Sequence, residues 1–215
     1  MRQNECTSLV KLTMPQAPLL WPSVLTPEPE IAAVKDLYAH LVGLQYSVDA
    51  WEAGLVLYVT TKHPPASVSA TVARRWRFIA CNECILELYH LRSRLAKIQA
   101  VKLRNCPSIR TLVDMAQLRS ARKRLDDDFP DIEALRHATA HRGENEAHDE
   151  IHAPDGLFAL SGFREPDRYS TPYEGKLRYL DINNESLTKI SIVVSEYLRA
   201  FEPAAAELQT QGHLE

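Results

Sequence analysis

The chain has 215 residues, of which 45% are hydrophobic and 25% charged, a composition typical of soluble globular proteins with one substantial core. It has no apolar stretch long enough to span a membrane, no basic start followed by an apolar leader, and only four cysteines. These features argue against a membrane protein and a disulfide-rich secreted protein, and we expect a reduced, cytoplasmic protein.

The formal net charge of −3 hides a strong segregation of charge along the chain. Residues 74–124 hold thirteen Lys or Arg and three acids, whereas the rest holds twelve bases and twenty-five acids. Such a basic segment can mark a surface for a polyanion such as nucleic acid. Alternatively, acidic helices neutralise these cations across the fold, and the sequence leaves both interpretations open.

The first half of the chain predicts an extended arm and two long helices. Residues 1–27 contain four prolines and no clear apolar period, so we expect an extended N-terminal arm. From residue 28, apolar side chains recur at steps of three and four up to Tyr58, which indicates one face of a long helix. A second apolar face of the same spacing predicts a helix over about 67–104, ended by Pro107.

The second half predicts two shorter helices, a hairpin and a last helix. One helix covers about 109–127, and the next opens at Pro130 and contains a histidine-rich stretch. Short apolar segments at 156–163 and 176–182, separated by a loop with Pro, Gly and Tyr, predict a β-hairpin. A helix capped near Asn183 and then a polar tail close the chain. The 109–127 helix has a basic face, a candidate RNA-binding surface formed by Arg119, Arg122, Lys123 and Arg124.

Together these elements predict an all-α fold. We expect an antiparallel helical bundle of four to five helices, with a small β-hairpin-like insertion at 156–182 before the last helix. Residues 28–215 would form a single domain behind the arm.

Two motifs have the spacing of functional sites but simpler interpretations. Cys81-Asn-Glu-Cys84 is spaced like a redox pair, which belongs at a helix start, yet both cysteines fall on an apolar face in mid-helix. Glu87 and His90 are spaced like one ligand pair of a di-metal bundle, which would need a second such pair. We therefore expect buried structural thiols in the first case and a solvated, partly ion-paired surface in the second.

Residues 135–152 hold four of the eight histidines. His137 and His141 are four residues apart, and Glu144 falls on the same face if the helix continues past Gly143. Imidazole and carboxylate are normal zinc ligands, so His137, His141 and Glu144 form a candidate metal site. A chance cluster of histidines on an exposed acidic helix is the simpler alternative.

The same stretch, LRHATAHRGE, resembles the signature of the HEPN superfamily. That signature is an arginine followed by a polar residue, commonly Asn, Asp or His, and then by a histidine four to six residues after the arginine. Arg136, His137 and His141 fit it, and the expected helical bundle, with basic helices ahead of the motif, agrees with it.

The resemblance implies a metal-independent endoribonuclease of the stress, defence or toxin kind, which uses no cofactor and forms a composite active site at a homodimer interface. His141 would be the acid–base catalyst, Arg136 would stabilise phosphate charge, and His137 would help to orient the substrate. Side chains five residues apart on one helix point about 140° apart, so two copies would pool Arg136 and His141. The implied partners are a second copy of the chain, RNA or a nucleotide, and an antitoxin protein.

Two alternatives stay open beside the nuclease. Many HEPN-like proteins are non-catalytic modules that bind nucleotides or proteins, and the third hypothesis is the metal-binding bundle. A run of acids directly precedes the motif, and its negative field would oppose a phosphate unless cations override it. These acids are Asp126, Asp127, Asp128, Asp131 and Glu133.

Overall fold

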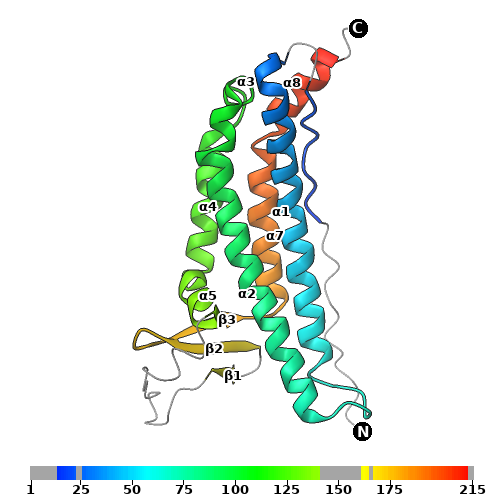
Figure 1. The fold of residues 1–215 in the computed structure, drawn as a ribbon, viewed down its shortest axis with the longest axis vertical. Helices are drawn as coiled ribbons and strands as arrows, with labels where there is room; N and C mark the ends of the chain where they lie inside the picture. Colours follow the sequence, from blue (N-terminus) through cyan, green and yellow to red (C-terminus); the bar gives the residue numbers. More distant parts are fainter. Residues whose placement is uncertain (1–13, 23–25, 141–160, 165–166, 213–215) are drawn as a thin grey trace.

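Four long helices, which run alternately up and down, form the body of the molecule (Figure 1). The computed structural model describes residues 14–22, 26–140, 161–164 and 167–212. The four helices are α1 (Glu28–Thr60), α2 (Ala70–Ala100), α4 (Met115–Asp128) and α7 (Asn184–Arg199). A mostly helical fold of the broad all-α class is therefore confirmed.

The two long helices predicted in the first half are confirmed as an antiparallel pair, α1 and α2. α1 begins directly after Pro27, with Glu28 and Glu30 in its first turn, where carboxylates favour the helix dipole. α2 is capped by Ser69, whose Oγ accepts the backbone N–H of Val72 over 3.3 Å. It ends before the predicted residue 104, because the chain tightens into a 3₁₀ turn, η1 (Lys102–Asn105).

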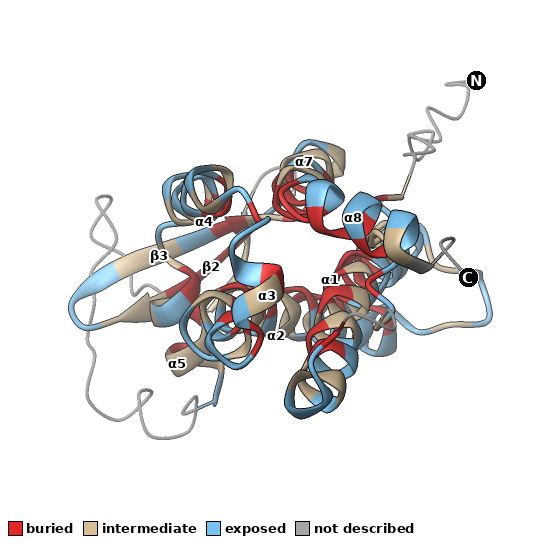
Figure 2. Ribbon diagram, turned by 90° about the horizontal axis from the view of Figure 1, so that it is seen from above, coloured by how far each residue is buried: buried red, intermediate tan, exposed pale blue. Residues whose placement is uncertain are grey.

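The core lies between the four helices, where their buried faces meet (Figure 2). On α1, fully buried apolar residues recur at the predicted steps of three and four, from Val34 to Tyr58. α7 contributes the same pattern through Ile190, Val194 and Tyr197. Each such side chain, taken from water, stabilises the fold by about 1.5–3 kcal/mol before entropy is counted.

The third helix is shorter than the sequence predicts. The prediction of one helix over about 109–127 is wrong at its start, because a single turn, α3 (Pro107–Arg110), is followed by a break. Asp114 explains the break: its carboxylate accepts the backbone N–H groups of Ala116 and Gln117, each over 2.9 Å, and so caps α4.

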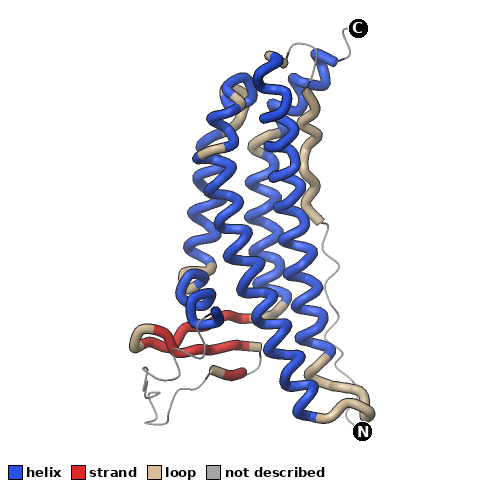
Figure 3. The backbone as a smooth tube through the Cα atoms, viewed as in Figure 1, coloured by secondary structure: helices blue, strands red, loops and turns tan. Residues whose placement is uncertain are grey.

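A small antiparallel sheet lies at one end of the bundle (Figure 3). Its strands, in spatial order, are β1 (Gly162–Arg164), β2 (Arg168–Tyr173) and β3 (Lys176–Asp181). The expected hairpin is corrected here, because β2 is a strand where the sequence predicts a loop. Among the described residues, Pro172 pairs with Leu177 of β3 near the end of β2, and proline is tolerated in strands mainly at such edge positions. Glu174 and Gly175, with φ of 49° and 70°, form the tight turn into β3. Residues 156–160 of the expected hairpin lie outside the described residues.

The chain after α7 is helical rather than a polar tail. α8 (Glu202–Gly212) buries Ala204, Ala205 and Leu208 at the opposite end of the bundle from the sheet (Figure 1). The prediction failed because alanine contributes little to an apolar pattern, although it packs well where helices approach closely.

The described part of the N-terminal arm, residues 14–22, has no helix or strand and runs beside α1 (Figure 1). Gln45 Nε2 donates a hydrogen bond to the backbone oxygen of Pro15 over 2.7 Å, and Leu20 is fully buried. No helix in the described ranges is both long enough and apolar enough to cross a bilayer.

Candidate functional site

The described part of the candidate motif lies on α5 (Ile132–Ala140), a short helix between α2 and the sheet (Figure 1). Its buried side faces the core through Ile132, Leu135 and Ala138. Arg136 and His137 lie at the border of this face and are half-buried. Both side chains are therefore held by their surroundings while part of each reaches the surface.

Arg136 lies against an aromatic ring of the neighbouring long helix. Its guanidinium carbon is 5.1 Å from the centre of the Tyr89 ring on α2, within the range of a cation–π contact. Its Nη1 is 3.4 Å from Nδ1 of His137. Tyr89 therefore fixes the position of the charge without neutralising it.

His137 stacks on the sheet. Its ring lies nearly parallel to that of Tyr173, at the end of β2, with a 16° interplanar angle and 6.1 Å between the ring centres. This is an offset stack, which orients the imidazole between α5 and the hairpin. The hairpin thus contributes to the candidate site.

The acids that precede the motif are each paired with a cation. Arg92 on α2 bridges Asp126 and Glu133, with nitrogen–oxygen distances of 2.7 and 2.8 Å. Arg178 on β3 pairs with Asp131 over 2.9 Å. The other two pairs are Lys123 with Asp127 at 2.5 Å and Arg124 with Asp128 at 4.0 Å. The negative field expected from the sequence is therefore largely balanced.

Arg136 differs from these cations in its partners. No carboxylate among the described residues lies within ion-pair distance of its guanidinium, although five acids lie in the ten positions that precede it in the sequence. A half-buried arginine without a carboxylate keeps its donors and its charge for another anion.

The structure describes one of the three residues of the candidate metal site, His137. Within the described ranges, no three His, Cys, Asp or Glu side chains are placed to hold a metal ion. His141 and Glu144, two of the three candidate ligands, lie outside these ranges. The candidate metal site, like the position of His141 in the nuclease motif, stays a prediction.

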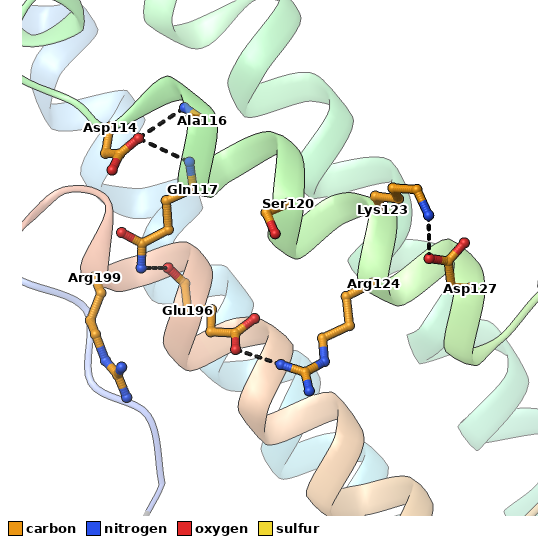
Figure 4. Close-up of a pocket in the computed structure, with 9 residues that line it drawn as sticks. All are labelled: Asp114, Ala116, Gln117, Ser120, Lys123, Arg124, Asp127, Glu196 and Arg199. Atoms are coloured by element: carbon orange, nitrogen blue, oxygen red, sulfur yellow. Dashed lines mark hydrogen bonds and ion pairs between the residues drawn. The ribbon is translucent and has the colours of Figure 1, made fainter.

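The basic face of α4 borders an open groove of about 800 Å³ between α4 and α7 (Figure 4). Two of the four cations on this basic face form ion pairs at the groove: Arg124 with Glu196 of α7, over 2.5 Å, and Lys123 with Asp127. Arg119 and Arg122 have no ion pair in the described part of the chain. The groove thus has mixed charge.

The two motifs set aside from the sequence are structural. Cys81 and Cys84 are fully buried, and burial raises the pKa of both thiols, so the expectation of inert core cysteines is confirmed. His90 is 49% exposed and its Nδ1 lies 3.4 Å from Glu87 Oε1. Glu87 is only 15% exposed and also lies 3.9 Å from Arg94, so this surface is ion-paired as expected but less solvated.

Three residues around the motif were missed from the sequence: Tyr89, Arg92 and Tyr173. Tyr89 and Arg92 lie three residues apart on α2 and so share one face, a signal that the sequence does contain. Tyr173 carried no such signal, because it stood in the segment predicted as a loop.

Comparison of the chain with protein-family models, curated proteins and solved structures found no significant match. The functional assignment therefore rests on the residues of this chain.

Proposed function

We propose that the protein is a HEPN-type, metal-independent endoribonuclease that depends on Arg136 and His141. The observation that carries the proposal is that Arg136, fixed on Tyr89 beside His137, has no carboxylate partner among the described residues, while the acids that precede it are paired with other cations. A permanently charged, planar guanidinium suits a phosphate group.

The proposed reaction is a transesterification within RNA. The ribose 2′-oxygen attacks the adjacent phosphorus, the bond to the 5′-oxygen breaks, and the products are a 2′,3′-cyclic phosphate and a 5′-hydroxyl end. His141 takes the proton from the 2′-hydroxyl and returns a proton to the leaving 5′-oxygen, so that the imidazole ends in its starting protonation state. Arg136 stabilises the charge that develops on the phosphoryl oxygens, and His137, stacked on Tyr173, helps to orient the substrate.

The proposed active form is a homodimer. Positions five apart on a helix point about 140° apart, so Arg136 of one copy and His141 of the other would together form the site. The remaining proposed partner is an antitoxin protein that would hold such an activity in check.

The test is RNA cleavage by purified protein in excess EDTA. We expect cleavage to persist in EDTA and to fall by about a hundredfold or more in Arg136→Ala and in His141→Ala, since each removes a charge or proton-transfer group. Arg110→Ala and His63→Ala, exposed residues away from α5, are the matched controls and should keep activity. Thermal melting checks that each variant is folded.

Three outcomes would contradict the proposal. Cleavage unaffected by either substitution would point to a contaminating nuclease, and cleavage abolished by EDTA would favour the metal-binding hypothesis. A folded wild-type dimer that cleaves no RNA under any of these conditions would leave the non-catalytic binding module.

A further inference from the structure

Three cations lie over three aromatic rings where the α1–α2 turn meets the sheet. Lys62 Nζ is 5.0 Å from the centre of the Tyr58 ring. The guanidinium carbon of Arg74 is 6.0 Å from the centre of the Phe78 ring, and that of Arg77 is 5.8 Å from the centre of the Phe163 ring. We call Lys62, Arg74 and Arg77 the cation cluster.

The rings beneath the cation cluster form one packed unit. Phe163 of β1 lies with its ring centre 4.8 Å from that of Phe78, 5.7 Å from that of Tyr58 and 5.9 Å from that of Tyr169. These side chains come from α1, α2 and two strands. The cations are therefore placed on a rigid base rather than on a flexible loop.

Positive charge exceeds negative charge in the cation cluster. Asp167 forms an ion pair with Lys62, whereas Arg74 and Arg77 have no carboxylate within ion-pair distance among the described residues. Burial and the nearby charge of Arg77 lower the pKa of Lys62. The buried Nε of Arg77 has no hydrogen-bond acceptor among the described residues. Like charges held this close cost free energy that a bound anion would recover.

The cation cluster and the candidate site share one side of α2. At 100° per residue, Arg74, Phe78 and Tyr89 lie within about 60° of one another around the helix. Tyr89 contacts Arg136, and fifteen residues of helix place it about 22 Å along the axis from Arg74. A chain of phosphates could thus contact both places.

We propose that the cation cluster binds the phosphate backbone of single-stranded RNA and leads it toward Arg136. This inference rests on the proposed function and names the surface that holds its substrate. The cation cluster is a different surface from the RNA-binding face that the sequence predicts on α4, where Lys123 and Arg124 are already paired with carboxylates.

The experiment measures binding apart from cleavage. A fluorescent oligoribonucleotide with 2′-O-methyl groups cannot undergo the transesterification, so anisotropy reports affinity alone. We expect Arg74→Gln and Arg77→Gln each to weaken binding about tenfold at 0.1 M salt, the loss of one charged hydrogen-bonding contact. The slope of log affinity against log salt should fall by about 0.7 for each phosphate contact removed.

Lys123→Gln and Arg124→Gln on α4, whose cations are already paired with carboxylates, are the matched comparison and should leave affinity within about twofold. Arg74 is exposed, so Arg74→Gln stays informative if Arg77→Gln melts at lower temperature. Inorganic phosphate is titrated as a competitor. If the cation cluster were a site for a free small anion, phosphate would occupy it and displace the oligonucleotide.

Three results would overturn the inference. They are equal affinity of wild type and both α2 variants, a loss confined to the α4 variants, and complete displacement of the oligonucleotide by millimolar phosphate. If only the proposed function fails, the protein cleaves no RNA, but Arg74→Gln still weakens binding of the oligonucleotide. The two failures can therefore be distinguished.

Discussion

Tyr197 ties α7 to α2 through one buried hydrogen bond. Its hydroxyl donates to the backbone oxygen of Leu95 over 2.9 Å, in a place where burial raises the pKa of the phenol. We expect Tyr197→Phe to lower the free energy of unfolding by about 1 kcal/mol, because the ring still packs while a buried acceptor loses its donor. Urea unfolding measures this, with the exposed Tyr179→Phe as control. Equal stability of the two variants would show that the bond contributes nothing.

Single residues of the candidate site were only partly predictable. Arg136 and His137 stand out in the sequence, because a short motif names them. Their contacts with Tyr89 and Tyr173 depend on how α5 docks between α2 and the sheet, which no local pattern encodes. The pairing of Arg92 with Asp126 and Glu133, more than thirty residues away, is of the same kind.

Two glycines of α1 should respond in opposite ways to substitution by alanine, because they differ in how closely α2 approaches them. A Cβ on Gly54 would stand 2.7 Å from Cys84 Sγ and 3.3 Å from the backbone oxygen of Ala80, whereas one on Gly43 would meet only the flexible Arg94 at 3.8 Å. We expect Gly54→Ala to destabilise the fold by about 1–3 kcal/mol, through overpacking. Gly43→Ala should instead stabilise it by up to about 1 kcal/mol, through helix propensity.

Chemical denaturation of both variants and of Gly54→Ala combined with Cys84→Ala separates the causes. If the close contact is responsible, the second substitution should restore part of the lost stability. A stabilising effect of Gly54→Ala alone would mean that α1 and α2 are not held this closely.

At the scale of elements, long amphipathic helices were predictable and their interruptions were not. α1, α2 and α7 follow from apolar side chains at steps of three and four, and β3 follows from its apolar run. The break at Asp114 was missed because one capping carboxylate outweighs a continuing apolar pattern. β2 was missed because Pro172 is usually excluded from strands.

The molecule as a whole should lose stability in acid. Hydrogen bonds from Lys102 and Arg168 hold the pKa values of Asp36 and Asp181 below the ordinary 3.8. Carboxyls with lowered folded pKa values stabilise the fold above their unfolded pKa, and this contribution disappears as pH falls through the folded values. We expect Asp181→Asn to lower Tm at pH 7 and to match wild type near pH 2. Asp49→Asn, an exposed carboxyl, is the control.

The charge segregation seen along the sequence is reduced in space. Cations of the basic segment pair with acids from other helices: Lys102 with an acid of α1, Arg92 with one of α5 and Arg124 with one of α7. Arg92 and Arg124 also pair with acids of α4. The sequence left this open because the partners depend on which helices become neighbours. Among the described residues, the cation cluster keeps an excess of positive charge, since Asp167 pairs with Lys62 and no carboxylate pairs with Arg74 or Arg77.

The junction between the sheet and α7 has a thermodynamic consequence. Asp181 ends β3 and holds Arg168 of β2, its backbone oxygen accepts the Ser186 hydroxyl over 2.7 Å, and Asn183 caps α7. Only Ile182 and Asn183 therefore lie between the end of the strand and the start of the helix. Tyr173 therefore lies on a sheet that is joined closely to the bundle. A ligand that binds at α5 would not have to order this surface, because the conformational entropy of the surface is already lost when the protein folds.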